Sequence, residues 1–258
     1  EAREIKKMTN EDLRQTMGRE WQSVRKRFHY PQLPQPELVD DIPNGCIDIK
    51  NLEIKVSEPF IQGFEQHGIE TEEAMNEVLT HELTHFMKYP GSVLNVLRLQ
   101  KAGQGLTDEQ RVSELRSAYT EAQTNLFMTQ EVNHPSTARM RRAYELQEGD
   151  DFGKLMYGLY QEISGQDFGV KLSKKERKLV EKLKDIRYLF DNTTEEQRRE
   201  RVRREPLSFR EFVEVMKEYQ PPQKGKGRSQ GEGRGNSSDP CSGSGNGFEG
   251  FTENQIRE

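Results

Sequence analysis

The hexapeptide Thr-His-Glu-Leu-Thr-His, residues 80–85, places two of the five histidines of this 258-residue chain four positions apart. We predict that it lies inside one helix, which runs from a capping Thr71 to about residue 88. Side chains four apart share one face of a helix, so His81 and His85 can point their ring nitrogens at the same ion. The stretch therefore predicts a metal site built on a helix.

Glu82 lies about 100° around this helix from His81, too far for a comfortable ligand but close enough to reach a metal-bound water. Zinc suits two imidazoles and an oxygen ligand, keeps a fourth position open and lowers the pKa of the water there to about 7. Glu82 can then take the proton of that water, which predicts hydrolysis with Zn²⁺ as cofactor and Glu82 as general base. The competing interpretation is a half-buried helix whose histidines bond to backbone carbonyls.

A third ligand has to come from another element. A capping sequence and an apolar seam predict a second helix from residue 107 to about residue 131, and Glu121 lies at the edge of this seam. We predict Glu121 as the third ligand, with Glu114, one heptad earlier, as the alternative. Asn125, one turn after Glu121, is predicted to bond the second ring nitrogen of a ligating histidine. His134 is the remaining downstream imidazole and is predicted to be a turn or cap residue.

His81-Glu-Leu-Thr-His85 followed on a second helix by Glu121-x-x-x-Asn125 resembles the gluzincin zinc metallopeptidases. The small size and the strand-then-helix lead-in are similar to the archaeal-type members called minigluzincins. The resemblance covers roughly residues 46–131. It implies that His81, His85 and Glu121 bind zinc, that Glu82 is the general base and acid, and that the substrate is a peptide or protein. The family usually has Asp at the position of Asn125, which leaves the role of this residue open.

Peptide hydrolysis also needs a donor for the developing oxyanion. Enzymes of this family often supply a histidine or a tyrosine from a later element. Tyr157 and Tyr160 lie on a predicted helix, residues 152–163, that could fold back over the cleft. We predict Tyr157 as the donor, with Tyr160 as its alternative and ordinary core packing as the competing interpretation for both.

The fold is predicted to be mainly helical (α+β), with a zincin-like core, a small sheet beside the active-site helix and extra helices on the C-terminal side. Alternating side chains from Cys46 to Val56 predict the only strand region, as one bulged strand or a hairpin. Its segment 52–56 is predicted to offer an exposed edge to an extended peptide. Further helices are expected at about 136–148, 152–163, 174–190, 194–204 and 208–219.

Changes in composition along the chain predict four regions. A helix with a proline-rich connector occupies residues 1–45, the metallopeptidase core residues 46–131, and a helical subdomain residues 132–220. Residues 221–258 are rich in glycine and serine and are predicted to be a flexible tail.

The overall composition excludes several classes of protein. No apolar stretch approaches the roughly 18–20 residues that a membrane span needs, and a net charge of −5 gives no general reason to bind nucleic acid. The two cysteines cannot build a disulfide scaffold. No signal peptide opens the chain, so we expect a cytoplasmic protein, although a first residue Glu1 leaves open where the natural start lies.

Two alternative functions stay open at this point. The first is a metal-stabilised binding or adaptor protein, in which a fourth protein ligand closes the site. The second is a latent protease-like protein that its own tail inhibits.

Overall fold

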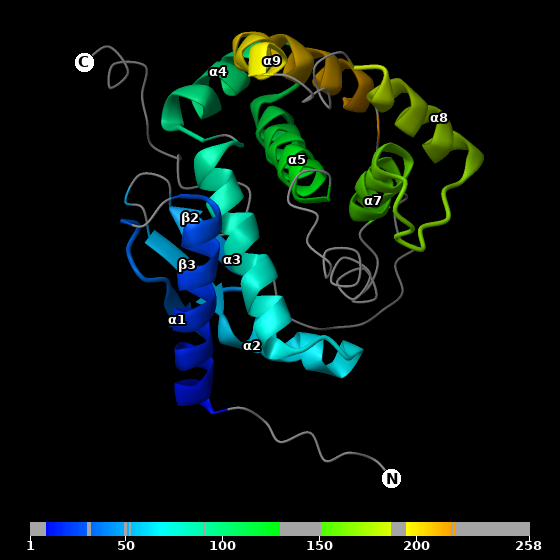
Figure 1. Ribbon diagram of the computed structural model, residues 1–258. Helices are drawn as coiled ribbons and strands as arrows, with labels where there is room; N and C mark the ends of the chain where they lie inside the picture. The colour runs from blue at the N-terminus through cyan, green and yellow to red at the C-terminus, as the bar shows by residue number, and fades with distance from the viewer. Residues whose placement is uncertain are drawn as a thin grey trace.

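The computed structural model describes residues 9–29, 32–48, 51, 53–89, 91–129, 151–186, 195–217 and 219. These residues form a mainly helical fold with one small sheet, which confirms the predicted α+β class (Figure 1). The helices are α1 (Asn10–Arg27), α2 (Glu58–Gly63), η1 (Phe64–His67), α3 (Thr71–Met87), α4 (Val93–Gly103), α5 (Glu109–Phe127), α7 (Asp151–Ser164), α8 (Lys174–Lys184) and α9 (Glu195–Met216).

The sheet has the strand order β1-β3-β2, with β1 at Glu37–Val39, β2 at Gly45–Asp48 and β3 at Glu53–Ser57. Strands β2 and β3 are antiparallel, with Ile47 opposite Ile54, so the hairpin interpretation is confirmed. Both β2 and β3 contact α3, which places the sheet beside the motif helix, as predicted.

Strand β1 was not predicted, because three residues between prolines carry no alternation that could reveal a strand. It pairs with β3 in parallel. Strand β3 is therefore the central strand, and the prediction that segment 52–56 forms an exposed edge is wrong. The edges of the described sheet are β1 and β2.

The first hydrophobic cluster, called here the N-terminal cluster, joins α1, the sheet and α3. Helix α1 begins after Thr9, which forms a capping box with Asp12. Its apolar stripe faces α3, and Trp21 is fully buried there. The buried members from α1 and α3 are Leu13, Met17, Trp21, Val24, Ala74, Met75, Val78, Leu79 and Leu83.

The second hydrophobic cluster, the C-terminal cluster, joins α4, α5, α7, α8 and α9. In Figure 1, α4, α9 and α8 follow one another around α5 and α7. The seam predicted for α5 is buried here, at Val112, Leu115, Tyr119, Ala122 and Leu126. Val180 and Leu183 of α8, and Ile186 just after its end, are buried in the same cluster.

Helix α9 corrects a predicted break. We expected two helices, 194–204 and 208–219. Pro206 lies between these segments, and a proline removes a backbone donor and crowds the preceding turn of a helix. The helix instead continues through Pro206. Phe209, Phe212 and Val213 are fully buried just after it, and this packing outweighs the local cost of the proline.

Some predicted limits shift by one residue or more. Asp108, not Thr107, caps α5 by accepting a hydrogen bond from the Arg111 N–H. Glu70 is the N-cap of α3, and the Thr71 hydroxyl donates instead to Glu65 at 2.5 Å. Helix α8 ends at Lys184 and not at residue 190.

The helix predicted at 136–148, His134 and the tail from residue 221 lie outside the described residues, so these predictions and the proposed region boundaries stay predictions. None of the helices in the described ranges combines the length and the apolar character that crossing a membrane requires.

Replacing Trp21 with alanine is expected to lower the free energy of unfolding by about 3–5 kcal/mol, because the change leaves a large cavity between α1 and α3. Leu94→Ala is the control, because this leucine is 50% exposed and its loss should cost less than about 0.5 kcal/mol. Urea unfolding followed by circular dichroism measures both values. Equal stability of the two variants would contradict the role given to the N-terminal cluster.

Candidate metal centre

Helix α3 carries both histidines on the face that it turns toward α5. The helix is buried along most of its length between the N-terminal cluster and α5. This burial is possible because its sequence there consists mainly of apolar and small polar residues. The rings of His81 and His85 meet edge to face, with centroids 4.7 Å apart. Their Nε2 atoms are 3.0 Å apart, so both rings direct the same nitrogen to one point.

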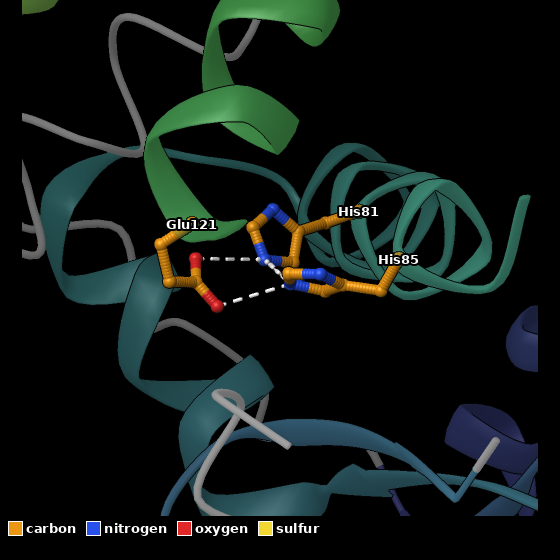
Figure 2. Close-up of side chains that lie close together, drawn as sticks. All are labelled: His81, His85 and Glu121. Atoms are coloured by element: carbon orange, nitrogen blue, oxygen red, sulfur yellow. Dashed lines mark hydrogen bonds and ion pairs between the residues drawn. The ribbon is translucent and has the colours of Figure 1, made fainter. Parts of the chain in front are cut away.

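Helix α5 brings Glu121 to this point, as Figure 2 shows. One carboxylate oxygen lies 3.0 Å from His85 Nε2 and the other 3.3 Å from His81 Nε2. The candidate ligand atoms of the three residues all lie within 4.8 Å of one another, so the group could hold a metal ion. Glu114 instead is half exposed and pairs with Arg111 at 3.0 Å, so the alternative third ligand is wrong.

The electrostatics of the group follow from its burial and its charges. Burial by itself would lower the pKa of His85, but the attraction of Glu121, with smaller contributions from Glu82 and the Tyr89 carbonyl, raises it to about 9. Burial would likewise raise the pKa of Glu121, but the two imidazoles hold it far below its ordinary value. A divalent cation held by these three residues would compete with protons for the imidazole nitrogens.

The three candidate ligands differ in exposure. The side chain of His85 is 5% exposed, that of His81 12% and that of Glu121 28%, so the group is closed behind His85 and opens toward solvent past the other two. Within the described ranges of the chain, the group contains three possible ligands and no fourth histidine, cysteine or carboxylate. An ion held here would keep a position for a water or a substrate atom.

Glu82 is buried beside the group, on the side of the sheet. Its carboxylate lies against Gly45, the first residue of edge strand β2: a Cβ on Gly45 would come within 3.0 Å of Glu82 Oε1 and 2.7 Å of Val78 Cγ1. Only a glycine lets β2 approach α3 this closely. Nothing in the sequence distinguishes Gly45 from the other glycines, because the contact exists only in the folded chain.

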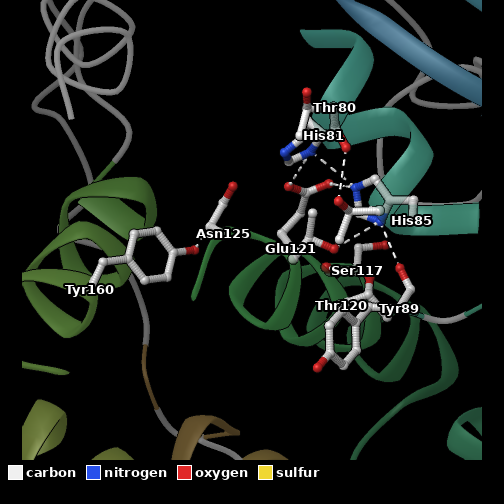
Figure 3. Close-up of polar contacts among 11 residues, drawn as sticks. Thr80, His81, His85, Tyr89, Ser117, Thr120, Glu121, Asn125 and Tyr160 are labelled. Carbon is white, nitrogen blue, oxygen red and sulfur yellow. Dashed lines mark hydrogen bonds and ion pairs between the residues drawn. The ribbon is translucent and has the colours of Figure 1, made fainter. Parts of the chain in front are cut away.

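The other ring nitrogen of His85 has two partners that the sequence reasoning missed. Nδ1 lies 2.7 Å from the Tyr89 carbonyl oxygen (Figure 3). It also lies 3.2 Å from Thr124 Oγ1. The position next to His85 that we assigned to Asn125 thus belongs to its neighbour Thr124, three residues after Glu121. Residues three apart on a helix lie on the same face, as residues four apart do, so the spacing from Glu121 could have indicated Thr124 as well as Asn125.

Asn125 reaches α7 instead. Its Nδ2 donates to the Tyr160 hydroxyl at 3.3 Å, and both side chains are buried. Figure 3 shows this pair to the side of the three candidate ligands. Tyr160 therefore contacts α5 one turn beyond Glu121.

Tyr157, the predicted oxyanion donor, is buried in the C-terminal cluster. Its ring packs edge to face against Tyr160, with centroids 5.6 Å apart, and stacks on Phe168. This packing is the ordinary core role that was weighed against catalysis, and the catalytic role of Tyr157 stays a prediction.

Comparison of the chain with profiles of known protein families, with curated proteins and with solved structures finds no match. The resemblance to the gluzincins thus stands on the motif residues and stays a prediction. The geometry by itself supports a group of two histidines and one glutamate that could hold a metal ion.

Replacing Glu121 with glutamine is expected to weaken the binding of Zn²⁺ or Co²⁺ by more than about 100-fold, because the change removes the only anionic ligand while keeping its shape. Isothermal titration calorimetry of the metal-free protein measures the affinity. Glu114→Gln is the control, because it makes the same change on the same helix at a side chain that is 50% exposed. It should leave the metal affinity unchanged. Equal affinities of the two variants would show that the metal binds elsewhere.

Proposed function

We propose that the protein is a zinc-dependent peptidase, and more narrowly an endopeptidase. The observation that supports this most is the convergence of His81, His85 and Glu121 on one point that opens to solvent, with Glu82 buried next to it. Such an arrangement serves metal-assisted hydrolysis of a carbonyl substrate.

The donor set favours zinc among the common divalent cations. Two imidazole nitrogens and one carboxylate oxygen suit a tetrahedral zinc site, whereas calcium and magnesium prefer ligand sets made of oxygen. Three protein ligands leave one tetrahedral position, which is typical of catalytic and not of structural zinc sites. When bound, zinc lowers the pKa of water and polarises a carbonyl.

The residues of the chain then have separate roles. His81, His85 and Glu121 would hold the cation, and Glu82 would take the proton of the attacking water and pass it to the leaving amine. Burial shields Glu82 from bulk water, which strengthens its electrostatic action on nearby groups. Tyr157 was the donor predicted for the oxyanion. The hydroxyl of its alternative, Tyr160, lies 3.3 Å from Asn125 Nδ2, one turn from Glu121.

Strand β2 supports a peptide as the substrate. It is an edge strand of the described sheet, and its first residue, Gly45, lies next to the Glu82 carboxylate. An extended peptide that pairs with such an edge would bring its backbone carbonyls past the general base. In this proposal the substrate pairs with β2, and not with the segment 52–56 that the sequence analysis had predicted as the edge.

Replacing Glu82 with glutamine is expected to lower the rate of peptide hydrolysis by about 10²–10⁴-fold while zinc stays bound, because an amide cannot accept the proton. His81→Ala should lose both activity and zinc. Digestion of denatured casein, followed by mass spectrometry, measures cleavage, and elemental analysis measures the metal. Glu72→Gln, on the exposed side of the same helix, is the control and should behave as wild type.

The possible outcomes separate the candidate functions. Normal cleavage by Glu82→Gln would overturn the mechanism. Wild-type protein that binds one zinc ion but cleaves nothing would point to the metal-stabilised binding protein, and cleavage that appears only after removal of residues 221–258 would point to the tail-inhibited form.

A further inference from the structure

We propose that the turn formed by Lys88, Tyr89 and Gly91 is a positioning element that holds His85 in the tautomer whose Nε2 is free to bind a metal ion. This role presupposes the metal site of the proposed function. It adds to that site a residue, Gly91, that lies outside the ligand set.

The tautomer follows from the partner of His85 Nδ1. The Tyr89 carbonyl oxygen, 2.7 Å away, can only accept a hydrogen bond, so Nδ1 carries a hydrogen. In the neutral ring the lone pair is then on Nε2, the nitrogen that faces His81 and Glu121. Thr124 Oγ1, 3.2 Å from Nδ1, is a second acceptor on α5.

The carbonyl of Tyr89 is held in place from two sides. The side chain of Tyr89 is 1% exposed and packs against Phe127 of α5, with ring centroids 6.3 Å apart. Its N–H donates to the Thr84 carbonyl at 3.4 Å, which ties the turn to the last turn of α3. The acceptor therefore belongs to the packed interior and not to a surface loop.

Gly91 closes the turn on His85 itself. Its N–H donates to the His85 backbone carbonyl at 3.1 Å, so the turn binds this residue at both its main chain and its ring. Gly91 has φ +69°, the left-handed region that side chains disfavour. A Cβ at this position would also lie 3.3 Å from the Lys88 carbonyl oxygen. Alanine should therefore strain the turn and displace the acceptor of Nδ1.

The test compares two glycines with nearly the same positive φ. Gly91→Ala is expected to lower the Zn²⁺ affinity by about 10–100-fold, and Gly91→Asn less, because asparagine tolerates φ near +70° better than alanine. Gly68→Ala is the matched control: Gly68 has φ +70° at the end of η1, and a Cβ there would contact nothing within 4 Å. It should lose stability but keep the wild-type affinity, as calorimetric titration with Zn²⁺ shows.

A second measurement reports on the hydrogen bond without any metal. In metal-free protein labelled with ¹⁵N-histidine, nuclear magnetic resonance follows how fast the Nδ1 proton of His85 exchanges with water. We expect faster exchange in Gly91→Ala and no change in Gly68→Ala. A merely structural role of Gly91 would destabilise both variants alike and would not separate them.

Each outcome decides something. If wild-type protein binds zinc and Gly91→Ala binds it equally well, the positioning role is overturned while the proposed function stands. Equal losses of affinity in Gly91→Ala and Gly68→Ala also overturn the role. If wild-type protein binds no zinc, the proposed function fails, and the positioning role fails with it. Should Gly91→Ala not fold, the exchange measurement on wild-type protein carries the test, and an Nδ1 proton of His85 that exchanges as fast as that of the exposed His67 overturns the role.

Discussion

Two hydrophobic clusters of this protein meet along α3 and α5, and the contact between these helices is polar at its centre. There, one carboxylate from α5 faces two imidazoles from α3, with most of the group removed from water. A buried charge is costly unless it is paired, so α3 and α5 have to keep this register. The candidate metal centre is thus also the electrostatic link between the two halves of the described fold.

Short hydroxylated side chains make this polar contact possible. Thr80 and Thr84 on α3, and Thr120 on α5, donate their hydroxyl hydrogens to carbonyls of their own helices. Their polar atoms are therefore satisfied without a partner across the interface, and their small volume lets the helices approach. Thr124 differs because its oxygen faces His85, which makes it part of the surroundings of the site.

The elements that the sequence predicts well are those with a local cause. The helical character of α3 and α5 follows from apolar periodicity, and the pairing of β2 with β3 from a short alternating hairpin. Strand β1 and the passage of α9 through Pro206 have no such local cause: each depends on packing against residues far away in the chain. Intrinsic preference yields to tertiary packing at these positions.

By itself, the sequence determined that His81 and His85 share one helical face, because their four-residue spacing alone dictates it. It also indicated that an acidic residue on a second helix could complete the group, because a metal held by two histidines needs a further ligand. Only the tertiary structure decided between Glu121 and Glu114, because that choice depends on the rotation of α5 against α3. It also placed Gly45 against Glu82 and the Tyr89 carbonyl against His85. These contacts join segments whose approach results from packing of the whole chain, and no local pattern encodes such an approach.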